Sequence, residues 1–173
     1  MYKIWFIDDE PAFRRDVKDC FNLKSEYGIY DNSIMMRIIS TGIDGMQAKE
    51  SITTVVIDDI PDLIFVDLRY PIDITNNETD IKKLHGVSVL KSLTGDIRYK
   101  NTMIVIFSQV SLSEDEKQYL IDLLGFENRK SQFLQKTHFG MDSISINKIA
   151  GMKIDKSCQN LRKIIDLLSK NIQ

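Results

Sequence analysis

The hydrophobic pattern of the chain alternates between short apolar runs and longer segments with helical spacing. The apolar runs have the length of buried strands and cover residues 2–7, 34–39, 62–67, 102–108 and 131–135. Between them, apolar residues recur every three or four positions, as they do on one face of a helix. Strands that alternate with helices predict an α/β fold of the doubly wound class, in which a five-stranded parallel sheet carries helices on both faces.

The helices expected between these strands have recognisable ends. They are expected over residues 11–23, 44–57 and 86–93, and from a cap at Ser111 or Ser113 to Leu124. Pro11 suits a first helical turn, and Gly125 ends the fourth helix. The stretch from Tyr27 to Asn32 is expected to be a loop.

Two segments exceed what the strand–helix alternation needs. The connection 69–85 is polar and long, which is typical of functional loops. The C-terminal segment 137–173 carries an apolar stripe with helical spacing over 158–172. We expect one domain over 1–173 that contains this insertion and this extended C-terminal segment. The stripe is expected to pack on the sheet as a last helix, and a homodimer contact is the alternative.

Composition and charge narrow the class of protein. The 173 residues are 43% hydrophobic and 28% charged, with a formal net charge of −2, which is typical of a globular domain. This charge favours neither direct nucleic-acid binding nor an anionic membrane, since both attract basic surfaces. No secretory signal or membrane-spanning run is apparent, so we expect a cytoplasmic protein. Cys20 and Cys158 are then expected to be free buried thiols, because a reducing compartment argues against the alternative, a disulfide.

Polar groups follow the apolar runs where each predicted strand ends. The pair Asp8-Asp9 follows the first run, and Asp67 closes the third. Ser108 closes the next run, and Lys136 follows the last. Because the carboxyl ends of parallel strands meet at one edge of a sheet, these side chains are expected to converge there. The acids suit a hard cation such as Mg²⁺, and the hydroxyl and amine suit a phosphoryl group on the central acid.

These residues lie in segments that resemble the receiver domain of two-component response regulators. The matching segments are 6–10 (FIDDE), 66–71 (VDLRYP), 86–91 (GVSVLK), 106–108 (IFS) and 133–136 (FLQK). They follow the order of that family and span residues 1 to about 136. The resemblance implies the flavodoxin-like receiver fold.

The resemblance also implies roles for the acidic residues. Asp67 matches the aspartate that accepts the phosphoryl group. Asp8 and Asp9 match the acidic pair that holds Mg²⁺ together with Asp67. The backbone carbonyl of Arg69 completes the protein's metal ligands in the family.

The remaining matches imply a phosphorylation-dependent switch. Lys136 matches the lysine that contacts the phosphoryl group, Ser108 the switch hydroxyl, and Phe133 the switch aromatic residue. Such a protein accepts its phosphoryl group from a histidine kinase or a histidine phosphotransfer protein and then changes its contact with a downstream protein. It is not an enzyme beyond its own Mg²⁺-dependent phosphoryl acceptance and autodephosphorylation.

Two other functions can be weighed from the same residues. Gln109 stands where the family has a small residue, Thr137 where it has proline, and the insertion 69–85 lies beside the acceptor. These departures favour, as the alternative, a receiver-like binding module that works without phosphorylation. A haloacid dehalogenase-type phosphatase needs a second acid two residues after the nucleophile, and Arg69 excludes it.

Overall fold

The computed structural model of the chain describes residues 1–30, 33–42, 45–68, 81–108, 112–125, 131–135, 161–162 and 165. For residues 107–108 and 131–135 it describes the backbone alone. The insertion predicted at 69–85 is thus described only from Ile81 onward, and the segment 137–173 only at three positions.

Six strands form one sheet in the order β2-β3-β1-β4-β5-β6. Their bounds are β1 Tyr2–Ile7, β2 Tyr27–Tyr30, β3 Ile34–Ile39, β4 Leu63–Asp67, β5 Met103–Ser108 and β6 Ser131–Gln135. All neighbouring pairs are parallel except β2 with β3. The predicted five-stranded parallel sheet is confirmed, and each strand ends where the apolar pattern placed its end.

The sixth strand, β2, occupies the stretch that was expected to be a loop, so that expectation was wrong. Its aromatic and β-branched residues favour a strand, although Gly28 does not. It runs antiparallel to β3, with Tyr27 opposite Arg37 and Tyr30 opposite Ile34. Four residues are too few for a local pattern to indicate a strand, and pairing with β3 decides the structure. The sheet therefore gains an antiparallel strand outside the five parallel ones.

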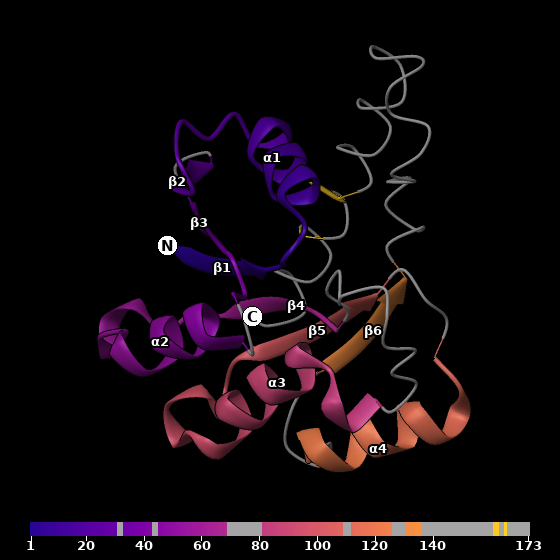
Figure 1. Cartoon of the computed structure of the whole chain (residues 1–173). Helices are drawn as coiled ribbons and strands as arrows, with labels where there is room; N and C mark the ends of the chain where they lie inside the picture. Colours follow the sequence, from indigo (N-terminus) through magenta and orange to yellow (C-terminus); the bar gives the residue numbers. More distant parts are fainter. Residues whose placement is uncertain are drawn as a thin grey trace, which may run out of the picture.

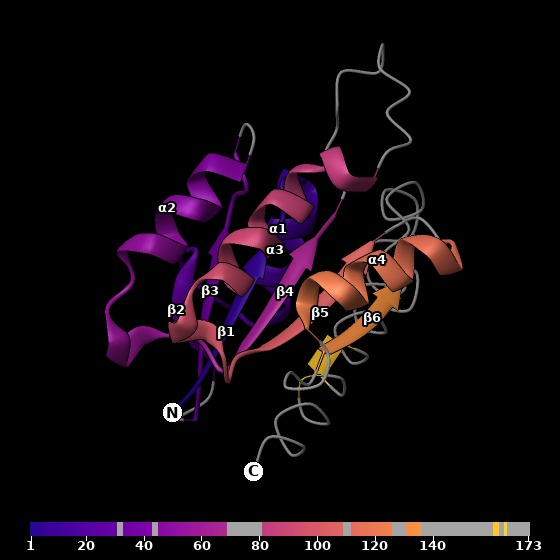
Figure 2. The same ribbon diagram turned by 90° about the horizontal axis from the view of Figure 1, so that it is seen from below.

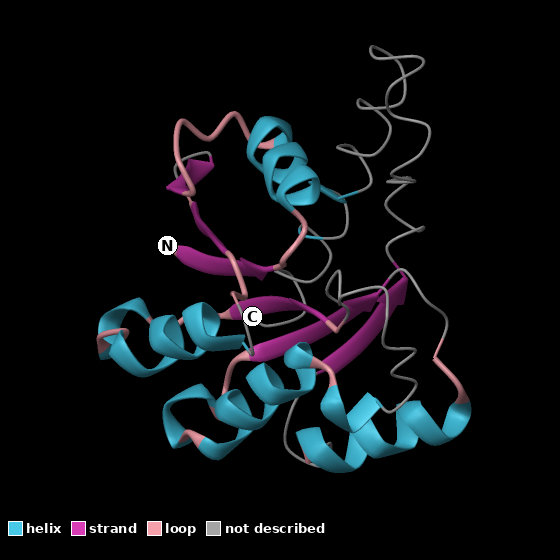
Figure 3. Ribbon diagram, in the orientation of Figure 1, coloured by secondary structure: helices cyan, strands magenta, loops and turns pink. Residues whose placement is uncertain are grey.

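Helices lie on both faces of the sheet, as predicted (Figures 1 and 3). The four α-helices are α1 Pro11–Cys20, α2 Met46–Thr54, α3 His85–Gly95 and α4 Glu114–Leu124. Short 3₁₀ turns follow or precede them at η2 Ile57–Asp59, η3 Ile81–Lys83 and η4 Ile97–Tyr99. Seen from below, α2, α3 and α4 lie together in front of the strands, and α1 lies behind them (Figure 2). None of the helices in the described part of the chain is long and apolar enough to span a bilayer.

The core consists of two buried clusters, one on each face of the sheet. Alternate residues of β1 point to opposite faces, so Phe6 belongs to the cluster under α1 and Trp5 to the cluster under the other helices. The rings of Phe6 and Phe65 stack with centroids 4.6 Å apart, which joins the two central strands. A parallel sheet buried on both faces explains why its strands read as nearly continuous apolar runs.

Part of the C-terminal segment packs against α1. Leu161 and Ile165 are buried in the same cluster as Val17 and Cys20, as expected for the apolar stripe. Arg162 donates a hydrogen bond to the carbonyl of Cys20. Cys20 is disulfide-bonded, which contradicts the expectation of free thiols. Cys158, the only other cysteine of the sequence, lies outside the described residues. The expectation rested on an assumed reducing compartment, whereas packing of the C-terminal segment on α1 decides the outcome.

Residues of the turn η4 cap the C-terminal end of α2. The Arg98 guanidinium donates to the carbonyls of Val55, at 2.9 Å, and Ile52, at 3.1 Å. The buried Tyr99 hydroxyl donates to the Ile52 carbonyl at 2.8 Å. The last carbonyls of a helix have no partner within the helix, so these donors satisfy groups that burial would otherwise leave unpaired. The contacts fix α2 beside α3 at the end of the sheet where the parallel strands begin.

Candidate functional site

The carboxyl ends of the parallel strands bring the predicted site residues to one edge of the sheet. The chain reverses its order of strand addition between β1 and β4, because β3 lies on one side of β1 and β4 on the other. Ile7 is opposite Val66 in this pair, so Asp8 and Asp67 follow at adjacent strand ends. Neighbouring strands lie about 4.8 Å apart, and open α/β sheets bind their ligands at this reversal point.

Asp8 is buried, with 0% of its surface exposed, and the loop that carries it is tightly held. The Asp8 backbone N–H donates to the carbonyl of Ile39 at 3.1 Å, which extends the β1–β3 ladder by one residue. One Asp8 carboxylate oxygen accepts from the N–H of Glu10 at 2.7 Å. The Asp8 carboxylate thus satisfies a donor just before the first turn of α1, where the helix dipole also favours a negative charge.

Arg14 fixes the same loop from within α1. Its guanidinium donates to the backbone carbonyls of Asp8, at 2.8 Å, and Asp9, at 2.9 Å. This contact orients two consecutive peptide groups and places a positive charge beside the acidic pair. Asp9 itself is only partly buried, in contrast to Asp8.

Asp67 ends β4 and is 2% exposed. Its backbone pairs with Phe107 on the next strand. The first turn of α3 presses against this strand end at Gly86. A Cβ atom on Gly86 would lie 2.7 Å from the Cα of Leu68 and closer still to the carbonyl oxygen of Asp67. Only glycine permits this approach, so the match of Gly86 to the receiver pattern has a steric reason beside Asp67, the candidate acceptor.

Backbone register places Ser108 at the same edge. Ser108 ends β5 opposite Gln135, the last residue of β6, and Lys136 follows Gln135 in the chain. Phe133 lies opposite Ile106 in the same pair of strands. The side chains of Ser108 and Phe133, and the whole of Lys136, lie outside the described residues, so their predicted contacts stay predictions.

No family model matches the sequence, and a comparison with curated proteins gives no match. Solved structures do match. The chain is similar to a two-component response regulator from Legionella pneumophila, with 13% identity and a TM-score of 0.52 over 96% of this chain and 99% of that one. The protein has the fold of a response regulator receiver domain. It is also similar to the N-terminal domain of a response regulator receiver protein from Methanoculleus marisnigri JR1, with 14% identity and a TM-score of 0.48 over 87% and 98%. A third match is the Mn²⁺-bound form of response regulator Rcp1, with 19% identity and a TM-score of 0.46 over 79% and 81%.

The donors that this receiver fold offers to a metal are hard oxygens. Asp8 and Asp67 supply carboxylates at adjacent strand ends, and Asp9 adds a third beside them in sequence. Among the described residues, no three His, Cys, Asp or Glu side chains gather as a complete metal site. Mg²⁺ is typically bound by one or two carboxylates and several waters, so this donor set suits it. The Arg69 carbonyl, the fourth predicted ligand, lies outside the described residues.

Two features of the receiver edge were not predicted from the sequence. Arg14 binds backbone carbonyls, and such a target leaves no pattern of residue types. Thr41 follows β3 and is fully buried, and its hydroxyl has no hydrogen-bond partner among the described residues. The Thr41 carbonyl accepts from the N–H groups of Gln47 and Ala48, at 3.1 and 3.2 Å, and so ties α2 to this edge. An apolar-to-polar step after a strand run is the only signal that could have pointed to Thr41.

Proposed function

We propose that the chain is a signalling receiver that accepts a phosphoryl group on Asp67 and switches its protein–protein contacts in response. The phosphoryl donor would be a histidine kinase or a histidine phosphotransfer protein, and the output a contact with a downstream protein. The observation that carries the proposal is the pair of buried carboxylates, Asp8 and Asp67, at the reversal point of a receiver fold.

The proposed reaction needs little covalent chemistry from the protein beyond the acceptor. A carboxylate oxygen of Asp67 attacks the phosphorus of a phosphohistidine, and an O–P bond forms as the N–P bond breaks. The donor histidine nitrogen leaves with the electron pair and regains a proton. Water later attacks the acyl phosphate, which restores the carboxylate and releases inorganic phosphate. The protein would catalyse only these steps on itself and would turn over no separate substrate.

The remaining residues would position and neutralise charge. Asp8, Asp9 and Asp67, with the Arg69 carbonyl, would hold Mg²⁺. When bound, Mg²⁺ would offset the negative charge that builds on the phosphoryl oxygens. Phosphoryl transfer depends mainly on such positioning and charge neutralisation.

On the opposite side of the phosphoryl group, Lys136 would supply a second positive charge. Ser108 would turn its hydroxyl toward a phosphoryl oxygen, and Phe133 would follow that movement. Through these two movements, phosphorylation of Asp67 would change the surface made by α4 and β6.

The alternative function is a binding module that keeps the fold without phosphorylation, favoured by Gln109 and Thr137. Beryllofluoride, which mimics a phosphoryl group on an acceptor carboxylate, separates the two functions. In the presence of Mg²⁺, a true receiver should show shifted amide resonances at Asp67 and along β5, and Asp67→Asn should show none. Unchanged spectra in the wild-type protein would support the binding module.

A further inference from the structure

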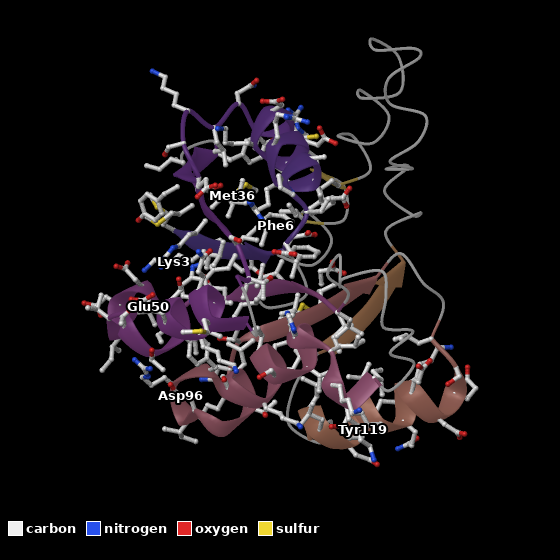
Figure 4. All side chains as sticks on the ribbon, viewed as in Figure 1. Lys3, Phe6, Met36, Glu50, Asp96 and Tyr119 are labelled. Atoms are coloured by element: carbon white, nitrogen blue, oxygen red, sulfur yellow. The ribbon has the colours of Figure 1, made fainter. Side chains whose placement is uncertain are left out.

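A recess of about 240 Å³ lies at the amino ends of the parallel strands, away from the candidate phosphorylation site. Among the residues that line it are Lys3, Trp5, Tyr27, Arg37 and Val56. These residues come from β1, β2, β3 and the segment that follows α2. In Figure 4 the labelled Lys3 marks this end of the sheet, beside α2. The extra strand β2 therefore forms one wall of the recess.

The walls of the recess are held by contacts within the protein. The Arg37 guanidinium carbon lies 5.1 Å from the centre of the Trp5 ring, and a guanidinium nitrogen of Arg37 donates to the Ser51 hydroxyl at 3.3 Å. The Tyr27 hydroxyl lies 2.8 Å from the sulfur of Met35. These contacts form the recess in the isolated chain, with a cation and two aromatic rings on its surface.

The rim beside the recess carries exposed apolar side chains. Val56 lines the recess and is 61% exposed, and the next residue, Ile57, is 77% exposed. Exposed Asp58 and Asp59 follow at once, and an Asp59 carboxylate oxygen lies 3.2 Å from the Lys3 ammonium. Single exposed apolar residues are ordinary, but here they adjoin a recess of matching character. A protruding Ile-Asp pair thus stands directly beside a recess lined by aromatic rings and an arginine.

We infer that this end of the molecule is a self-association surface, in which Ile57 and Asp58 of each copy enter the recess of the other beside Trp5 and Arg37. A two-fold interface uses the same patch on both copies, so the patch must be complementary to itself. This patch meets that requirement, because it presents an apolar protrusion followed by an acid next to a recess that offers the base Arg37 beside Trp5. The acid in the lining, Asp59, is paired with Lys3 of its own chain.

We expect two copies to associate through these side chains rather than by pairing strands at the edge of β2. The Ile38 N–H donates to the Glu26 carbonyl, so alternation along the ladder turns the N–H and C=O of Tyr27 away from β3. The Ser25 hydroxyl already donates to the Tyr27 carbonyl at 2.6 Å and lies 3.3 Å from its N–H. The outward groups of Tyr27 are thus occupied, which hinders pairing with another strand at this point of the edge.

Sedimentation velocity over a wide concentration range tests this inference on the full chain. The wild-type protein should pass from monomer to dimer as concentration rises. Ile57→Asp should raise the dimer dissociation constant at least tenfold, because it removes the apolar protrusion and places a charged side chain where an apolar one would be buried. Asp58→Arg should weaken the dimer as well, since it places a cation against Arg37. Asp58→Glu should retain it.

Met46→Asp is the matched control. Met46 is an apolar residue of similar exposure, 66%, at the opposite end of α2. This variant should dimerise like the wild type. A wild-type protein that stays monomeric up to about 1 mM, or a dimer that Ile57→Asp and Asp58→Arg leave unchanged, would overturn the inference. The second result would place the interface elsewhere, for example on the stripe at 158–172.

Discussion

Replacing Gly86 by alanine should distort the candidate acceptor site around Asp67. The added Cβ would lie 2.7 Å from the Cα of Leu68, whereas ordinary contacts begin at 3.4 Å, so the shortfall is 0.7 Å. The carbonyl oxygen of Asp67 is closer still. Both neighbours are backbone atoms and cannot swing aside. Either α3 or the end of β4 must therefore move by a comparable distance.

Two effects of different size should follow. Overpacking of this kind costs about 1–3 kcal/mol of unfolding free energy, which exceeds the gain of up to about 1 kcal/mol from a better helix former. For a chain of this length, each kcal/mol lowers the melting temperature by about 2–4 °C. A displacement near 1 Å at a reacting group can reduce a rate about 100-fold, so phosphoryl labelling of Asp67 should slow by one to two orders of magnitude.

Gly95→Ala supplies the matched control. Gly95 ends the same helix, and an added Cβ there meets nothing within 4 Å. Thermal unfolding and acetyl phosphate labelling of the two variants should be measured side by side. The control should be labelled as fast as the wild type and should be at least as stable. A Gly86→Ala protein as stable as Gly95→Ala, and labelled as fast, would refute the close approach of α3 to the acceptor strand.

Three further predictions concern the core, the loop after β1 and the cysteines. Tyr99→Phe removes the hydrogen bond to the Ile52 carbonyl and should cost about 1 kcal/mol in urea denaturation. Burial raises the pKa of Tyr99 from 10.0 to about 12, so the unfolded chain loses this proton first as pH rises. The free energy of unfolding should therefore fall between pH 10 and 12. If it falls no more steeply in the wild type than in Tyr99→Phe, this reasoning is wrong. Arg14→Gln should weaken Mg²⁺ binding about tenfold in calorimetry. The control is Arg15→Gln, at an exposed position of the same helix, which should leave the Mg²⁺ affinity unchanged. Equal affinities of the two variants would contradict a positioning role for Arg14. Denatured, unreduced protein should react with no thiol reagent at Cys20, and finding two thiols per chain would contradict the disulfide.

The parallel strands were predictable from the sequence because burial on both faces demands continuous apolar runs. The strand ends then indicated where Asp8 and Asp67 lie, since the carboxyl ends of parallel strands meet at one edge of the sheet. β2 was missed because its pairing with β3 is a tertiary contact that four residues do not reveal. The disulfide of Cys20 was missed for a different reason. Helix packing permits the bond, but a reducing compartment was assumed, and residue types do not reveal the redox state of the cysteines.

The details of the edge depend on backbone geometry that residue types do not encode. Arg14 recognises two carbonyls, and no spacing rule predicts which carbonyls a guanidinium will reach. Gly86 was part of a matching segment, but its reason, contact with the backbone of Asp67 and Leu68, appears only once α3 is placed. The self-association surface likewise needs the fold, because it joins residues from β1, β2, β3 and the segment after α2.

Phosphoryl labelling of Asp67 tests the proposed function most directly. The intact mass of the protein should be followed during incubation with acetyl phosphate and Mg²⁺. We expect a gain of one phosphoryl group in the wild type and in Asp115→Asn, an exposed acid on α4. Asp67→Asn should show no gain, and removing Mg²⁺ should suppress it in every variant. A wild-type protein that gains no mass, or an Asp67→Asn protein that is still labelled, would contradict the assignment of Asp67 as the acceptor.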